Sequence, residues 1–127
     1  MPIYNFNISD DRKAVSWNIE NAVIKLYFKY GVLDALYSKL INAIIIIRST
    51  REVGINNLFI YKVDGTLKSN PQLPFSSDEV GGVYSIWYKE GALDQTVVLA
   101  SKNNPHYDYK TTFNLRDEKF SKLSLTK

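Results

Sequence analysis

The spacing of apolar residues changes along the chain near Gly54. Before this point, apolar residues recur every three or four positions in two stretches, as in a helix that buries one face. The first stretch contains Ile19, Val23, Leu26 and Tyr30. Ser16 or Asn18 could cap its start, and Gly31 would end it. The second runs from about Val32 to Asn42, so the spacing predicts two N-terminal helices.

Four consecutive isoleucines, Ile44 to Ile47, interrupt this helical spacing. Their β-branched side chains favour a strand, and an unbroken apolar run is typical of a strand buried on both faces. We therefore predict a central strand that ends near Arg48. Val, Ile, Tyr and Phe are frequent throughout residues 15–48, and an all-β structure for this part is the alternative.

After Gly54 the apolar residues alternate with polar ones, which is the spacing of strands. Asp64-Gly65 predicts a tight turn between two of these strands. The predicted strands are residues 57–63, 66–68, 83–88, 95–100, 107–115 and 120–125. Turns and, at residues 70–78, a loop with two prolines connect these strands, which predict an antiparallel meander.

These elements predict one α+β domain over residues 1–127, with two N-terminal helices packed on a five- to six-stranded, mostly antiparallel sheet. An all-β sandwich is the alternative fold. Helices and strands do not alternate as a doubly wound nucleotide-binding fold requires. The expected core consists of Leu26, Leu33, Leu36, Leu40, Ile60, Ile86, Val98 and Phe113.

The composition excludes several kinds of chemistry. The chain has no cysteine and one histidine, so thiolate catalysis, Cys-type zinc sites and two-histidine metal sites are excluded within one chain. The glycine pair Gly81-Gly82 lacks the lysine that a phosphate-binding loop needs. We expect no cofactor and no metal. The net charge of +3 predicts a solvated basic surface and no specific binding of nucleic acid.

The first residues predict a cytoplasmic protein. Met1 to Asn7 lack the basic and apolar segments of a signal peptide, although secretion by a non-classical route stays open. The longest apolar run, Ala43 to Ile47, is far shorter than the roughly 20 residues of a membrane-spanning helix.

His106 is the one imidazole that could take part in acid–base catalysis. On a strand, His106 and Asp108 would point to the same side, and Ser101 is the nearest hydroxyl in sequence. A small hydrolase centred on His106 is therefore one alternative function. A loop histidine at the start of a strand is the favoured interpretation, and we predict no catalytic residue.

Aromatic residues are the most distinctive feature of the second half, in a chain with nine tyrosines, six phenylalanines and two tryptophans. Strict alternation places Val83, Ser85 and Trp87 on one face of a strand. The opposite face then carries Tyr84, Ile86 and Tyr88. Both faces are bulky, and a small domain can cover only one of them well.

The chain therefore has more aromatic side chains than one covered face can bury. This leads to the main hypothesis, a non-enzymatic binding protein whose aromatic sheet face engages a protein or another macromolecule. A small ligand on the same face is a further candidate partner, and association with a second copy of the chain is one form of the hypothesis. The predicted contact residues are Tyr84, Trp87, Tyr88, Tyr107, Tyr109 and Phe113.

Two segments of this half carry a resemblance to a known family. The first segment is residues 82–88 with Gly91, and the second is Pro105 with Tyr107-Asp108-Tyr109 and then Phe113-Asn114. Both resemble segments of actinoporin- and aegerolysin-type β-sandwich cytolysins. The resemblance covers about a third of the chain. It implies that Tyr107, Tyr109 and Phe113 contact a phosphocholine headgroup and that a helix at Val32–Ala43 enters the membrane. A membrane-surface or pore-forming protein, with Val32–Ile47 at the interface, is thus the second hypothesis.

Overall fold

A computed structural model describes residues 3–127 and contains three antiparallel β-sheets. The N-terminal sheet consists of β1 (Tyr4–Ile8), β2 (Ala14–Ile19) and β3 (Ala22–Tyr27). The middle sheet consists of β4 (Val32–Ser38), β5 (Ala43–Arg48), β6 (Leu58–Lys62) and β7 (Leu67–Ser69). The C-terminal sheet consists of β8 (Val80–Trp87), β9 (Asp94–Ser101), β10 (Tyr109–Asn114), β11 (Lys119–Phe120) and β12 (Ser124–Leu125). One short helix, α1 (Thr50–Val53), precedes β6.

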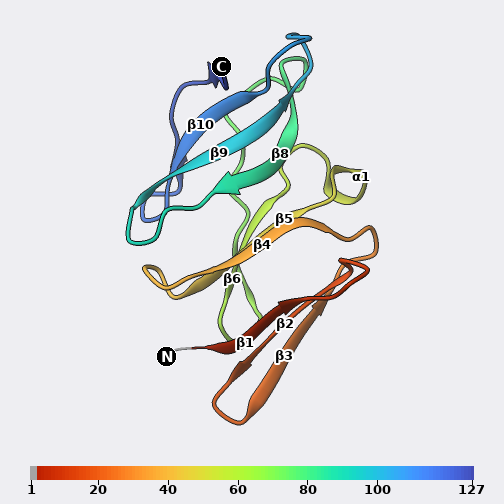
Figure 1. The fold of residues 1–127 in the computed structure, drawn as a ribbon, viewed down its shortest axis with the longest axis vertical. Helices are drawn as coiled ribbons and strands as arrows, with labels where there is room; N and C mark the ends of the chain where they lie inside the picture. Colours follow the sequence, from red (N-terminus) through yellow and green to blue (C-terminus); the bar gives the residue numbers. More distant parts are fainter. Residues whose placement is uncertain (1–2) are drawn as a thin grey trace.

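The three sheets form three layers, with the middle sheet between the other two (Figure 1). One hydrophobic core joins the middle sheet to the C-terminal sheet, and a second joins it to the N-terminal sheet. Trp17 of β2 is fully buried in the second core, and its indole N–H donates to the Val63 carbonyl at 2.7 Å. The described chain is therefore a stack of sheets with two interiors and two outer faces.

β5 lies at the centre of this stack, and the prediction of a buried strand here is confirmed. Ile45 and Ile47 belong to the core beneath the C-terminal sheet, and Ile44 and Ile46 belong to the core above the N-terminal sheet. Successive side chains of a strand point to opposite faces, so a strand between two cores must be apolar at every position. Each buried isoleucine contributes about 1.5–3 kcal/mol.

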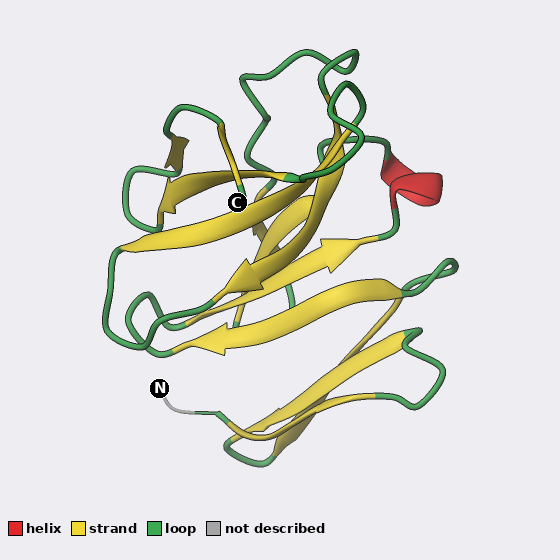
Figure 2. Ribbon diagram, turned by 45° about the horizontal axis from the view of Figure 1, so that its top comes forward, coloured by secondary structure: helices red, strands yellow, loops and turns green. Residues whose placement is uncertain are grey.

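The prediction of two N-terminal helices is wrong, and the all-β alternative describes this part of the chain. Residues expected to be helical form the end of β2, then β3 and β4 (Figure 2). Among residues 3–127, 51% are in strands and 3% are helical. The membrane-inserting helix that the cytolysin resemblance implied at Val32–Ala43 is likewise absent, because these residues form β4, the turn that follows it and the first residue of β5.

Packing and turn chemistry explain the error. β4 lies against both cores, with Ala35 in one and Leu36 against the other, so its apolar residues do not alternate. The β2–β3 hairpin turns at Glu20, which adopts a φ of 52°. Glutamate seldom adopts a positive φ, and no glycine or proline marks the break between the two strands. Of the expected core residues, Leu33 and Leu40 are exposed, whereas Ile60, Ile86, Val98 and Phe113 are buried.

Candidate functional site

β8 is irregular, and its irregularity decides which aromatic side chains reach the surface. Gly82 has a φ of +103°, and the pairing of β8 with β9 shifts between Val83 and Ser85. A bulge of this kind inserts one residue and reverses the facing of those beyond it. Val83 and Ile86 consequently both belong to the core.

Because of this bulge, the side chains of β8 do not lie on the faces that strict alternation predicted. Tyr84 and Trp87 were expected on opposite faces, but both are exposed, and Ser85 and Trp87 pair with the outward residues of β9. We call this surface the outer face. It comprises Tyr84, Ser85, Trp87, Thr96, Val98, Lys110 and Thr112. The glycine pair Gly81-Gly82 lies inside β8.

Gly82 is required by the close approach of α1 and the segment before β6 to β8. A Cβ atom there would lie 2.7 Å from the Thr50 methyl group and 3.2 Å from Asn57 Oδ1. The buried Asn57 amide accepts from the Val83 N–H at 2.8 Å, and it donates to the carbonyls of Val83 and Arg48 at 2.6 and 2.8 Å. Asn57 therefore fixes the start of the irregular strand against the middle sheet.

Trp87 is 54% exposed at the other end of β8. It pairs with Thr96 of β9, which pairs in turn with Thr112 of β10. The turn that follows is held by the buried Gln95, whose amide accepts from the Lys89 N–H and donates to the carbonyls of Lys89 and Ala92. The indole thus projects from a rigid hairpin.

Tyr84 is 39% exposed and is fixed by Asp108, whose carboxylate accepts a short hydrogen bond from the Tyr84 hydroxyl. Asp108 directly precedes β10, so this bond spans β9. Partial burial, together with the hydrogen bond and the negative charge of Asp108, raises the pKa of Tyr84 to about 12. The ring is therefore neutral and held in place at physiological pH.

The other four predicted contact residues do not all reach the outer face. Tyr107 is 44% exposed in the loop between β9 and β10. Tyr88 and Tyr109 are half-buried against the core, and their hydroxyls donate to Ser38 and Asn103. Phe113 is 1% exposed and packs against Phe120 in the core, so its side chain is not available to a partner.

A hollow of about 210 Å³ opens on the outer face beside the row that contains Trp87. We call it the lysine hollow, and it is lined by Thr96, Lys110, Thr111, Thr112, Ser121, Lys122 and Ser124. Ser121 Oγ accepts from the N–H and the hydroxyl of Thr112, and the Thr111 hydroxyl donates to the Ser121 carbonyl. These bonds hold the segment between β11 and β12 against β10.

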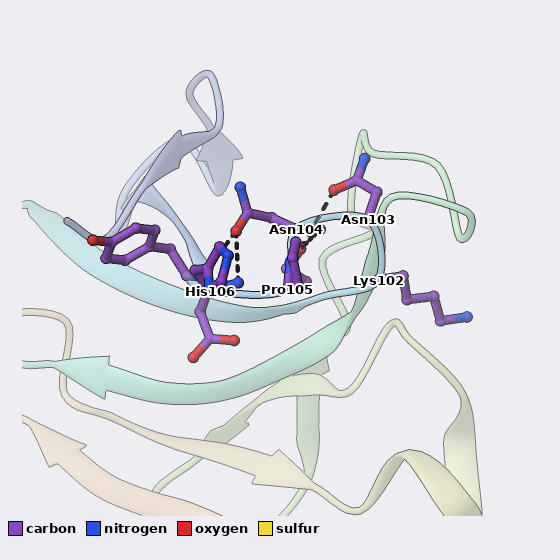
Figure 3. A pocket seen from close by; sticks show the side chains of 8 residues that line it. Lys102, Asn103, Asn104, Pro105 and His106 are labelled. Carbon is purple, nitrogen blue, oxygen red and sulfur yellow. Dashed lines mark hydrogen bonds between the residues drawn. The ribbon is translucent and has the colours of Figure 1, made fainter.

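A larger hollow of about 470 Å³ lies within the β9–β10 loop, residues 101–108 (Figure 3). Most of its polar groups bond to one another. Asn104 Oδ1 accepts from the N–H groups of His106 and Tyr107, both at 2.9 Å, while Ser101 Oγ accepts from the Asn104 N–H. Lys102 extends away from the other labelled side chains. Asparagine turns therefore shape this loop.

The arrangement gives no support to a catalytic dyad at His106. The side chain is exposed, and Asp108 is engaged by Tyr84. Within residues 3–127, no hydrogen bond joins the His106 imidazole to Asp108 or Ser101. The same described residues contain no group of three or more histidine, aspartate or glutamate side chains that could hold a metal ion.

Sequence reasoning missed Asn57, Gln95 and the lysine hollow. Asn57 follows Asn56, and Gln95 lies between Asp94 and Thr96, so neither stands out in the sequence as a buried amide with several backbone partners. Lys110 and Lys122 line the same hollow because β12 pairs with β10. No local sequence pattern predicts this long-range pairing.

No helix within the described part of the chain is long and apolar enough to cross a membrane. Comparison with known proteins finds no matching family model, no similar curated protein and no similar solved structure.

Proposed function

We propose that this protein is a non-enzymatic binding module whose outer face, on β8, β9 and β10, contacts a macromolecular partner. The observation that carries the proposal is the exposure of Tyr84 and Trp87 on one face, which depends on the bulge in β8. Tyrosine and tryptophan bury a large area at a low cost in side-chain entropy, and they are enriched at binding surfaces.

The setting of the two rings supports the proposal. Asp108 holds Tyr84, and Gln95 holds the hairpin that carries Trp87. Binding of a partner therefore costs little conformational entropy at these two residues. Val98, between Ser85 and Lys110 on the same face, is only 1% exposed. Neighbouring side chains thus cover the centre of the face, and the rings stand at its surface.

The test is a binding panel that compares Trp87→Ala with Tyr27→Ala, which removes an exposed ring from the N-terminal sheet. The panel contains dextran, heparin, polygalacturonate, oligo-dT, and phosphatidylcholine vesicles with and without phosphatidylserine. Self-association is measured by sedimentation. We expect W87A to weaken the binding of at least one of these by about 30-fold or more, since hot-spot residues are worth at least 2 kcal/mol. Y27A should bind as the wild type does.

Both variants should keep the circular dichroism spectrum of the wild type, because neither ring belongs to the core. Equal affinities of W87A and the wild type would contradict the proposal. So would a wild-type protein that is monomeric and binds no member of the panel with a Kd below about 1 mM.

A further inference from the structure

Four polar groups of the lysine hollow have no partner among residues 3–127. The hydroxyls of Thr111, Thr112 and Ser121 bond to one another or to the backbone. In contrast, no hydrogen bond or ion pair within the described chain uses the side chains of Lys110, Lys122, Thr96 or Ser124. Two ammonium groups and two hydroxyls are therefore free to bind a ligand.

The charge of the hollow is one-sided. Its lining contains two lysines and no carboxylate. Asp94 begins β9 and Asp108 directly precedes β10, and each already accepts a hydrogen bond, from Asn114 and Tyr84 respectively. The hollow is thus complementary to an anion, and its hydroxyls add neutral donors and acceptors beside the two cations.

Trp87 lies next to the lysine hollow. Thr96 lines the hollow and is the cross-strand partner of Trp87, and paired residues of this kind have Cβ atoms about 4.5–5.5 Å apart. One ligand can therefore cover the indole and reach the hollow. Such a ligand needs a flat apolar surface, many hydroxyls and a negative charge in one repeating unit.

We infer that the outer face binds an anionic polysaccharide, with a sugar ring on Trp87 and a sulfate or carboxylate group in the lysine hollow. The C–H groups on one face of a pyranose ring pack against an indole. The ring hydroxyls suit Thr96 and Ser124, and the anion suits Lys110 and Lys122. This inference rests on the proposed function and names the class of its partner.

Single-stranded nucleic acid fits the same surface less well. Proteins that bind it combine several stacking rings with a basic groove that follows the phosphates. The outer face exposes two rings, Tyr84 and Trp87, and only two lysines line its hollow, which is no groove that follows a phosphate backbone.

The test compares K110Q/K122Q with K25Q/K39Q, which removes two exposed lysines elsewhere and lowers the net charge by the same amount, from +3 to +1. Heparin tests binding to sulfate groups, and polygalacturonate tests binding to carboxylate groups. Dextran is the neutral polysaccharide, and oligo-dT represents single-stranded nucleic acid. We expect K110Q/K122Q to weaken binding to heparin or polygalacturonate by about tenfold or more and to reduce its salt dependence. K25Q/K39Q should change it by less than about threefold.

Three results would overturn the inference. Dextran could bind as tightly as the anionic polymers, both lysine pairs could have equal effects, or oligo-dT could bind more tightly than either glycan. If W87A abolishes binding in any of these cases, the outer face remains the binding surface and only the class of partner changes. If W87A has no effect on any polymer, the proposed function itself fails.

Discussion

Asp108 and Tyr84 show how one pair of residues shapes the outer face. The Asp108 carboxylate accepts from the Tyr84 hydroxyl and holds the ring across β9. A short segment that contains Tyr107-Asp108-Tyr109 suggested a contact with a lipid headgroup or a pairing of Asp108 with His106. Neither pattern predicts the partner that Asp108 has, because Tyr84 lies 24 positions earlier in the chain.

The Tyr84 hydroxyl should titrate late, because its pKa is raised from 10.0 to about 12 by partial burial and by Asp108. A raised pKa means that folding favours the neutral phenol, so the stabilisation is complete below pH 10 and is lost as the pH rises through 12. We expect the tyrosinate absorbance that Tyr84→Phe removes to be the part that titrates near pH 12. Asp108→Asn should lower the pKa of Tyr84. If Tyr84→Phe instead removes absorbance that titrates near pH 10, the Tyr84 hydroxyl has no raised pKa and is not held by Asp108.

Strands and turns were predicted well where a glycine-containing turn sequence marks the end of a strand. The strand before Asp64-Gly65 and the turn itself are confirmed as β6 and the β6–β7 connection. The prediction failed where these signals are missing. The turn at Glu20 uses a residue that seldom adopts a positive φ, and the segment between β4 and β5 contains neither glycine nor proline.

Glu20→Gly distinguishes the hairpin from the helix that the spacing predicted. In a two-residue hairpin loop with a positive φ at its first position, glycine removes the steric cost of the side chain. We expect E20G to raise the free energy of unfolding by about 0.5–1 kcal/mol. In the first turn of a helix, the same change would lower it. Urea denaturation measures the sign, with Asn21→Ala in the same turn as the control.

At the scale of the whole molecule, three stacked sheets explain both the apolar centre and the aromatic surface. The run Ile44–Ile47 needs a core on each side, and the sequence was sufficient to predict a buried strand there. It was not sufficient to predict three layers, because the order in which sheets stack depends on contacts between distant strands. It also could not place the aromatic residues, since a shift of one residue in β8 exchanges the two faces.

Acrylamide quenching of tryptophan fluorescence tests the central claim, that the outer face presents Trp87 to a partner. Trp17 is fully buried and Trp87 is 54% exposed, so the wild-type emission should contain one shielded and one accessible component. Trp87→Phe should remove the accessible component, and a saturating amount of the polymer that binds should shield it in the wild type. If Trp87 is already shielded in the free protein, or is quenched equally in the saturated complex, the outer face is not the binding surface.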